Sequence, residues 1–127
     1  MKADKENKPP RTGLHKEYFT DGKLAITGEY RDGKKTGTWT YYLRNGKVKA
    51  TGKYENDEMT GPWKWYRENG ELWQTGQFVN SKQVGEWKRY HLNGKLMDVG
   101  MFVDGKRAGE WKIYDEEGNL ARVKKYK

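Results

Sequence analysis

The sequence predicts an all-β protein, an open single-layer antiparallel meander of stacked β-hairpins built from about five copies of a 24-residue repeat, the last copy partial. Three observations predict this class: regularly spaced tryptophans, glycines at fixed repeat positions, and Asn-Gly pairs between short apolar segments. The tryptophans Trp39, Trp63, Trp87 and Trp111 stand 24 residues apart without slippage.

Other positions of the repeat keep the same period. One holds tyrosine in every copy, a second holds tyrosine or phenylalanine, and a third holds leucine or valine. These positions are Tyr18, Tyr42, Tyr66, Tyr90 and Tyr114; Tyr30, Tyr54, Phe78, Phe102 and Tyr126; and Leu24, Val48, Leu72, Leu96 and Leu120. All 16 glycines fall on repeat positions with turn or spacing roles, so none is left for a phosphate-cradling loop.

Each repeat contains two turn signals. Asn45-Gly46 and its equivalents tolerate positive φ, which a tight hairpin turn requires. The stretch 32–36 and its equivalents read as a longer polar turn. Because turns recur every ~12 residues, we expect roughly ten antiparallel strands of about seven to nine residues, running as one meander from Leu14 to Tyr126.

The hairpin register is open at this level. A strictly alternating two-residue hairpin places Trp39 opposite Gly52, where an indole could lie over bare backbone, and sends Tyr42 to the other face. A bulged three-residue turn instead brings Tyr42 and Val48 together. In either register, equivalent side chains of neighbouring hairpins form ladders along the sheet.

Composition agrees with a thin sheet and defines two parts of the chain. Hydrophobic residues make up 33% of the sequence and aromatics 14%, whereas an ordinary domain is roughly 45–50% apolar. Residues 1–12, with two prolines and alternating charges, predict a flexible basic N-terminal arm. Residues 13–127 predict one hairpin-repeat domain.

Catalysis is disfavoured by the inventory of reactive side chains. Ser81 is the only serine, the histidines His15 and His91 lie in different repeats, and there is no cysteine. No nucleophile–base pair and no metal-ligand spacing can be assembled from them, so we expect no enzyme activity, no metal and no cofactor. The sequence has no membrane-spanning run and no signal-peptide pattern, which favours a cytoplasmic location.

The net charge of +8 sits mostly at the chain ends. Residues 1–12 carry +2, residues 119–127 carry +4, and the repeats between them only +2, so nucleic-acid binding is not expected. One basic position persists inside the repeats and could meet phosphates or anionic lipid head groups, although lysines on a wet face also serve solubility. It holds Lys16, Lys64, Lys88 and Lys112.

The motif Gly37-x-Trp39-x-x-Tyr42-x-x-Asn45-Gly46, followed by Gly52-x-Tyr54, resembles the bacterial MORN-repeat variant family. The resemblance covers residues 13–126 and implies stacked hairpins. Proteins of that family are described as antitoxins of toxin–antitoxin systems or simply as MORN-repeat proteins. The related eukaryotic MORN proteins are linked to acidic lipids, scaffolding and dimerisation.

The leading expectation is therefore a non-enzymatic protein-interaction module whose partner is another polypeptide, with an antitoxin or immunity-like neutraliser of a toxin as one form of it. The alternative is a peripheral scaffold on anionic membranes. Self-assembly through the open edges, near residues 14–20 and 120–126, can accompany either. Residues that depart from the ladders are the candidates for partner binding: Tyr41, Trp65, Arg67, Trp73, Arg89, His91, Met97 and Met101.

Overall fold

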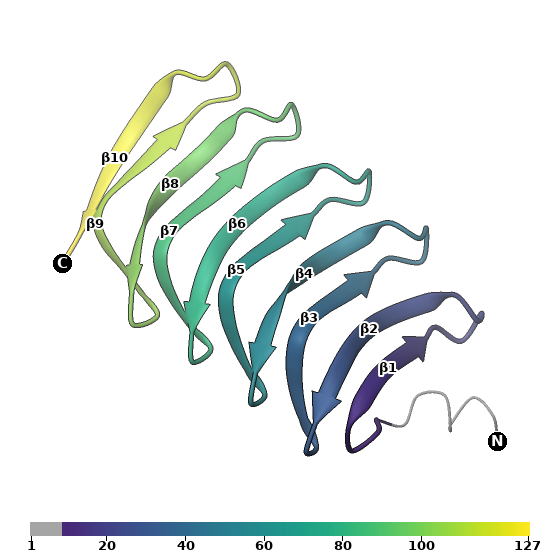
Figure 1. Cartoon of the computed structure of the whole chain (residues 1–127). Coiled ribbons are helices and arrows are strands. Elements are labelled where there is room, and N and C mark those ends of the chain that lie inside the picture. The colour runs from purple at the N-terminus through teal and green to yellow at the C-terminus, as the bar shows by residue number, and fades with distance from the viewer. Residues whose placement is uncertain (1–8) are drawn as a thin grey trace.

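The computed structural model describes residues 9–127, which form a single sheet of ten antiparallel strands in chain order, with no helix (Figure 1). The predicted all-β meander is confirmed. The strands are β1 Gly13–Tyr18, β2 Leu24–Arg31, β3 Lys34–Tyr42, β4 Val48–Glu55, β5 Glu58–Tyr66, β6 Leu72–Val79, β7 Lys82–Tyr90, β8 Leu96–Val103, β9 Lys106–Tyr114 and β10 Leu120–Tyr126.

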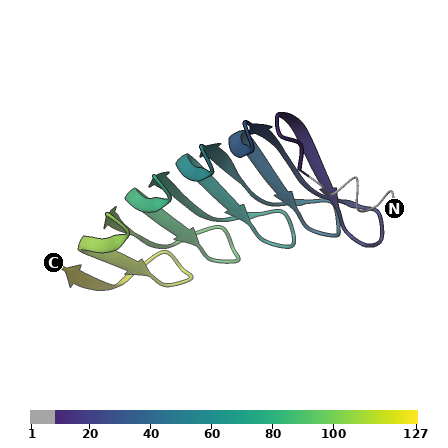
Figure 2. The same ribbon diagram turned by 90° about the horizontal axis from the view of Figure 1, so that it is seen from below.

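The sheet is a curved band. Figures 1 and 2 show bowed strands, with β1 and β10 at opposite ends of the stack. Each strand is hydrogen-bonded only to its neighbours in the chain, as expected of a quasi-one-dimensional repeat protein. Within residues 9–127 no helix is long and apolar enough to cross a membrane.

The predicted N-terminal arm lies partly outside the described residues, which begin at Pro9. The last two residues of the arm are hydrogen-bonded to the turn between β2 and β3. The carbonyl of Arg11 accepts a hydrogen bond from the Gly33 amide at 2.7 Å, and Thr12 Oγ1 accepts one from the Asp32 amide at 3.1 Å. The boundary between arm and repeat domain stays a prediction.

The prediction for the two kinds of turn was wrong, because their lengths are reversed. The connection predicted to be the longer one has only two residues outside the strands: Asp32-Gly33 has φ of 51° and 79°, and Asn56-Asp57 has φ of 50° and 70°. Positive φ at both central residues identifies a type I′ turn, whose twist matches that of the flanking strands.

The Asn-Gly connection is the longer one, with five residues between β3 and β4. Only its glycine has positive φ, 88° at Gly46. Asn45 acts through its side chain instead: Oδ1 accepts from the Lys47 amide at 2.9 Å, and Nδ2 donates to the Glu68 carbonyl of the next hairpin at 2.9 Å. The asparagine therefore stabilises its own loop and joins it to its neighbour.

The register combines features of both predicted alternatives. Trp39 does stand opposite Gly52, and a bulge between Tyr41 and Tyr42 also places Tyr42 opposite Val48. The indole does not cover Gly52, however. It lies on Gly28 of the preceding hairpin, where a Cβ would stand 2.0 Å from the ring. A second bulge interrupts the register between β2 and β3 at this point, between Thr27 and Glu29.

One continuous aromatic ladder forms the core. The four repeated tryptophans are 1–4% exposed although no second layer covers the sheet. Their side chains must therefore lie on the inner side of the bend, which we call the inner face. Successive rings meet edge to face at 5.2–6.3 Å between centroids. The ladder consists of His15, Tyr30, Trp39, Tyr54, Trp63, Phe78, Trp87, Phe102, Trp111 and Tyr126.

Candidate interaction surface

A second row of side chains runs beside the tryptophans on the inner face. It is two residues from each tryptophan along the odd-numbered strands, and side chains two apart in a strand share a face. We call it the variable row, because its chemistry changes from strand to strand. Its members are neighbours in the register from β1 to β10: Glu17, Ile26, Tyr41, Ala50, Trp65, Gln74, Arg89, Asp98, Ile113 and Arg122.

The middle of this row is aromatic. Trp65 is half-buried, with its ring 6.1 Å from that of Phe78 and 5.5 Å from that of Trp87. The hydroxyl groups of Tyr41 and Tyr54 are hydrogen-bonded at 2.9 Å. Burial, and then that hydrogen bond, raise the pKa of Tyr41 well above its usual value, so its phenol stays neutral.

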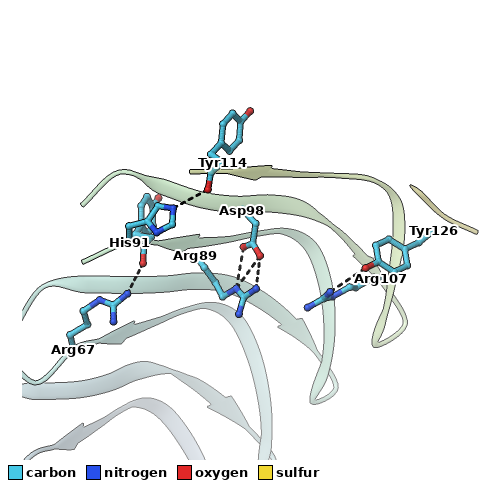
Figure 3. Close-up of polar contacts among 8 residues, drawn as sticks. Arg67, Arg89, His91, Asp98, Arg107, Tyr114 and Tyr126 are labelled. Atoms are coloured by element: carbon cyan, nitrogen blue, oxygen red, sulfur yellow. Dashed lines mark hydrogen bonds and ion pairs between the residues drawn. The ribbon is translucent and has the colours of Figure 1, made fainter. Parts of the chain in front are cut away.

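An ion pair, Arg89–Asp98, follows the aromatic part of the row (Figure 3). Asp98 is 5% exposed, and both of its carboxylate oxygens accept from Arg89 Nε, at 3.1 and 3.2 Å. Arg89 Nη2 also donates to Asp98. These hydrogen bonds raise the pKa of the Arg89 guanidinium despite its partial burial. The guanidinium therefore stays charged, and its N–H groups donate to both oxygens of the Asp98 carboxylate.

Four candidates lie away from this row, near the five-residue turns: Arg67, Trp73, His91 and Met97. Arg67 Nη2 donates to the Tyr90 carbonyl at 2.6 Å (Figure 3). His91 Nε2 lies 2.9 Å from the Tyr114 carbonyl, which requires the imidazole proton on Nε2 (Figure 3). Each bond joins one hairpin to the next. The guanidinium of Arg67 and the imidazole of His91 thus use hydrogen-bonding capacity to hold neighbouring repeats together.

Two side chains of this group share one repeat position beside the turns. Trp73 is half-buried and lies under the Arg67 guanidinium, whose Cζ is 5.6 Å from the ring. Met97, also half-buried, occupies the same position one repeat later. Met101 is separate again: it pairs with Glu86 in the register, points to the outer face and is 47% exposed. The eight predicted residues therefore lie in three places: the variable row, the region beside the five-residue turns, and the outer face.

The lysine position forms a row on the outer face. Lys64 pairs with Thr75 and Thr75 with Lys88, so these two lysines are two strands apart, about 10 Å. Val99 separates Lys88 from Lys112, while three threonines separate Lys16 from Lys64. Lys88 Nζ also lies 3.5 Å from a Glu86 carboxylate oxygen. The basic row exists, but its charge is sparse.

The repeat geometry has a direct counterpart among known proteins. The MORN repeat variant model matches five times, at residues 11–32, 35–56, 59–80, 83–104 and 107–127, which together span most of the chain. The chain belongs to the MORN repeat variant family.

Other comparisons add little to this assignment. No curated protein matches the chain. Among solved structures it matches a chain of the "GtfA/B complex bound to UDP and GlcNAc", with 11% identity and a TM-score of 0.33. That match covers 79% of this chain and 22% of the other, so the MORN chain spans about a fifth of its length.

Sequence reasoning missed part of the surface of this MORN protein. Gln74 and Asp98 belong to the variable row but lie on even-numbered strands, where no repeated tryptophan marks the face. Arg107 was also missed, and its guanidinium lies 4.7 Å from the Trp111 ring centroid. Only the strand register shows that Gln74 and Asp98 lie in the variable row. No cluster of metal-ligating side chains occurs between residues 9 and 127.

Proposed function

We propose that this MORN protein is a non-enzymatic module that holds another polypeptide against its inner face, along the variable row. One observation carries the proposal. Tyr41, Trp65 and Arg89 were selected from the sequence only because they break the repeat pattern, and they occupy one row on one face. Each is half-buried, so its atoms are partly desolvated and still reachable.

Some repeat positions serve folding, and others are free to serve binding. The tryptophans, glycines and turn residues are committed to folding, so their positions vary little between the inner copies. The variable row carries an apolar patch followed by an ionic patch, which gives a partner a direction along the sheet. Tryptophan, tyrosine and arginine are the side chains that most often dominate binding energy at interfaces. Because ring contacts and ion pairs already hold them, little side-chain entropy would be lost on binding.

An antitoxin or immunity-like neutraliser is one role that such a surface supports. Neutralisation needs a rigid surface that covers a partner and no chemistry of its own. The curved sheet supplies a long one, from β1 to β10. We propose the cytoplasm as the place of action, and a toxin as one class of partner.

Peripheral binding to anionic membranes is the second candidate, and the outer lysine row favours it. Lys16, Lys64, Lys88 and Lys112 project from the face opposite the variable row. Because the two surfaces are on opposite faces, substitutions can separate the two functions. Lipid capture would also fade as salt screens the lysines, whereas an aromatic interface would persist.

Capture from native lysate at low salt and at about 0.5 M salt tests both candidates. Trp65→Ile is the inner-face variant, because Ile113 occupies the same repeat position and shows that isoleucine fits there. The matched outer-face variant is Lys64→Ala/Lys88→Ala/Lys112→Ala. Circular dichroism first establishes that both variants are folded.

A single polypeptide retained at high salt, lost in Trp65→Ile and kept by the lysine variant supports the interaction module. Its affinity for the purified wild type and for both variants then completes the test. Recovery of anionic lipid alone, abolished by salt and by the lysine substitutions, would overturn the module and leave the membrane scaffold.

A further inference from the structure

The inner face has a small hollow at its C-terminal half, with a volume of ≈ 90 Å³. It lies between β6 and β9, beside the Arg89–Asp98 pair. Figure 3 shows the Arg107 guanidinium directed toward that pair. Aromatic and polar side chains line it: Gln74, Gln83, Trp87, Arg89, Asp98, Phe102, Arg107 and Trp111.

The hollow exists because one repeat position changes from tryptophan to arginine. In the preceding repeat, Trp65 covers Phe78 and contacts Trp87, filling the equivalent space. One repeat later Arg89 takes that position and extends to Asp98 instead. The rings of Trp87, Phe102 and Trp111 then border open space.

The charge of the hollow is positive. Arg89 and Asp98 neutralise each other, which leaves Arg107. Its guanidinium lies over Trp111 and makes one long hydrogen bond, 3.3 Å from NH1 to the Tyr126 hydroxyl. Among residues 9–127 no carboxylate pairs with it, and the side-chain amides of Gln74 and Gln83 have no hydrogen-bond partner. The site therefore has spare donors around one uncompensated positive charge.

We propose that this hollow binds the carboxylate of an aspartate or glutamate side chain from the partner polypeptide. Its volume equals that of about three waters, enough for a carboxylate and its adjoining methylene group. Arg107 and the glutamine amides donate to the oxygens, while Trp87 and Trp111 contact the methylene carbons. This inference rests on the proposed function, since it names a feature of the polypeptide that the inner face would hold.

The proposal can be tested without the partner. Blocked glutamate, N-acetyl-glutamate N-methylamide, is titrated into the labelled full-length protein at constant ionic strength while the indole N–H signals of Trp87 and Trp111 are followed by NMR. Saturable shifts are expected with blocked glutamate and none with blocked glutamine. A single charge-assisted site of this size should bind in the millimolar range, about 1–10 mM.

Two variants separate binding from folding. Arg107→Gln should weaken glutamate binding at least about tenfold through loss of charge-assisted hydrogen bonds. It should fold, because Gln83 occupies the same position one repeat earlier. Lys35→Gln is the matched control: it removes a cation from that same position, above Trp39 and Tyr54, in a repeat where the neighbouring row position holds Tyr41. It should leave binding unchanged.

A third variant fills the hollow without changing net charge. Arg89→Trp/Asp98→Gln reproduces the Trp65–Gln74 pair of the preceding repeat and should abolish glutamate binding. Equal shifts with blocked glutamine, no saturation, or equal weakening by Arg107→Gln and Lys35→Gln would each overturn the proposal. If a captured partner binds Arg107→Gln as tightly as the wild type, the interaction module is supported but the proposal that the hollow binds a carboxylate of the partner is overturned.

Discussion

The indole of Trp87 lies so close to Gly76 that a Cβ on that glycine would stand 2.2 Å from two ring atoms. The φ angle of Gly76 is not in the positive region, so the backbone itself would accept other residues. Glycine is required there by space alone. The same contact recurs for Gly28, Gly52 and Gly100 beneath Trp39, Trp63 and Trp111. Each tryptophan thereby joins two hairpins.

Gly76→Ala should therefore destabilise the protein by about 3 kcal/mol or more, because the methyl group must displace a buried ring. Urea unfolding followed by tryptophan fluorescence measures the change. Trp87→Ala alone should destabilise by about 3–5 kcal/mol. In the double variant the alanine at 76 no longer meets an indole, so the combined effect should be well below the sum. Strict additivity would contradict the contact.

The repeat itself was predictable because the inner copies pack with the same residue types at the same positions. Trp39 and its equivalents, the ladder positions and the hairpin order follow from a fixed period. The turn lengths did not follow, because both connections contain the same turn-forming residues. Only Gly46 has positive φ in the Asn45-Gly46 connection, whereas Asn56 and Asp57 both have it, and the two connections leave different numbers of residues outside the strands.

The candidate site was predictable only in part, for a related reason. Departure from the repeat identified Tyr41, Trp65 and Arg89, but it could not show that they share a face with Asp98. Two bulges per repeat, one within the hairpin and one between hairpins, shift the simple alternation, so the face of a residue depends on where the bulges fall. Arg67 and His91 depart from the repeat as well, yet each bonds to the next hairpin.

The Arg89–Asp98 pair should respond unequally to removal of its two members. Arg89→Ala leaves a carboxylate that is 5% exposed without its partner and should destabilise by about 3 kcal/mol. Asp98→Ala leaves an arginine side chain that is 38% exposed and can hydrate, so its effect should be nearer 1 kcal/mol. Urea unfolding of both variants checks this order. A larger effect for Asp98→Ala would contradict the assigned burial.

Lys124 should prevent copies of the chain from stacking end to end in register. It stands opposite Trp111 in the position that glycine holds in the other repeats, while His15 takes the tryptophan position in β1. An incoming ring would meet a side chain there. Self-assembly through the open edges stays a prediction, but this arrangement opposes its simplest form, and basic edge strands also discourage pairing.

The wild type should therefore sediment as a monomer. His15→Trp/Lys124→Gly gives the two ends the tryptophan and the glycine that meet between internal repeats, so it should associate in a concentration-dependent manner. His15→Trp/Lys124→Ala is the control, because it removes the charge but keeps the Cβ. Analytical ultracentrifugation distinguishes the three proteins. Association of the alanine variant to the same extent would show that charge, not space, keeps the ends apart.

The last hairpin should be the most sensitive to acid. Asn45 and its equivalents accept a backbone amide with their side chain, but Glu117 occupies that position in the last turn. Asp115 accepts backbone amides in this turn instead: its Oδ1 accepts from the amides of Asn119 at 2.9 Å and Glu117 at 3.0 Å. Those hydrogen bonds, Asn119 first, hold the pKa of Asp115 below its usual value.

Because the folded-state pKa of Asp115 is lowered, the stabilisation by its carboxylate is complete above the unfolded-state pKa, near 3.9, and is lost as pH falls through the folded-state value. Asp115→Ala should therefore lower Tm at neutral pH, and the difference from wild type should shrink steadily as pH is taken below about 4. Thermal unfolding by circular dichroism across this range measures it. A Tm difference that stayed constant with pH would mean that the carboxylate charge does not stabilise the turn.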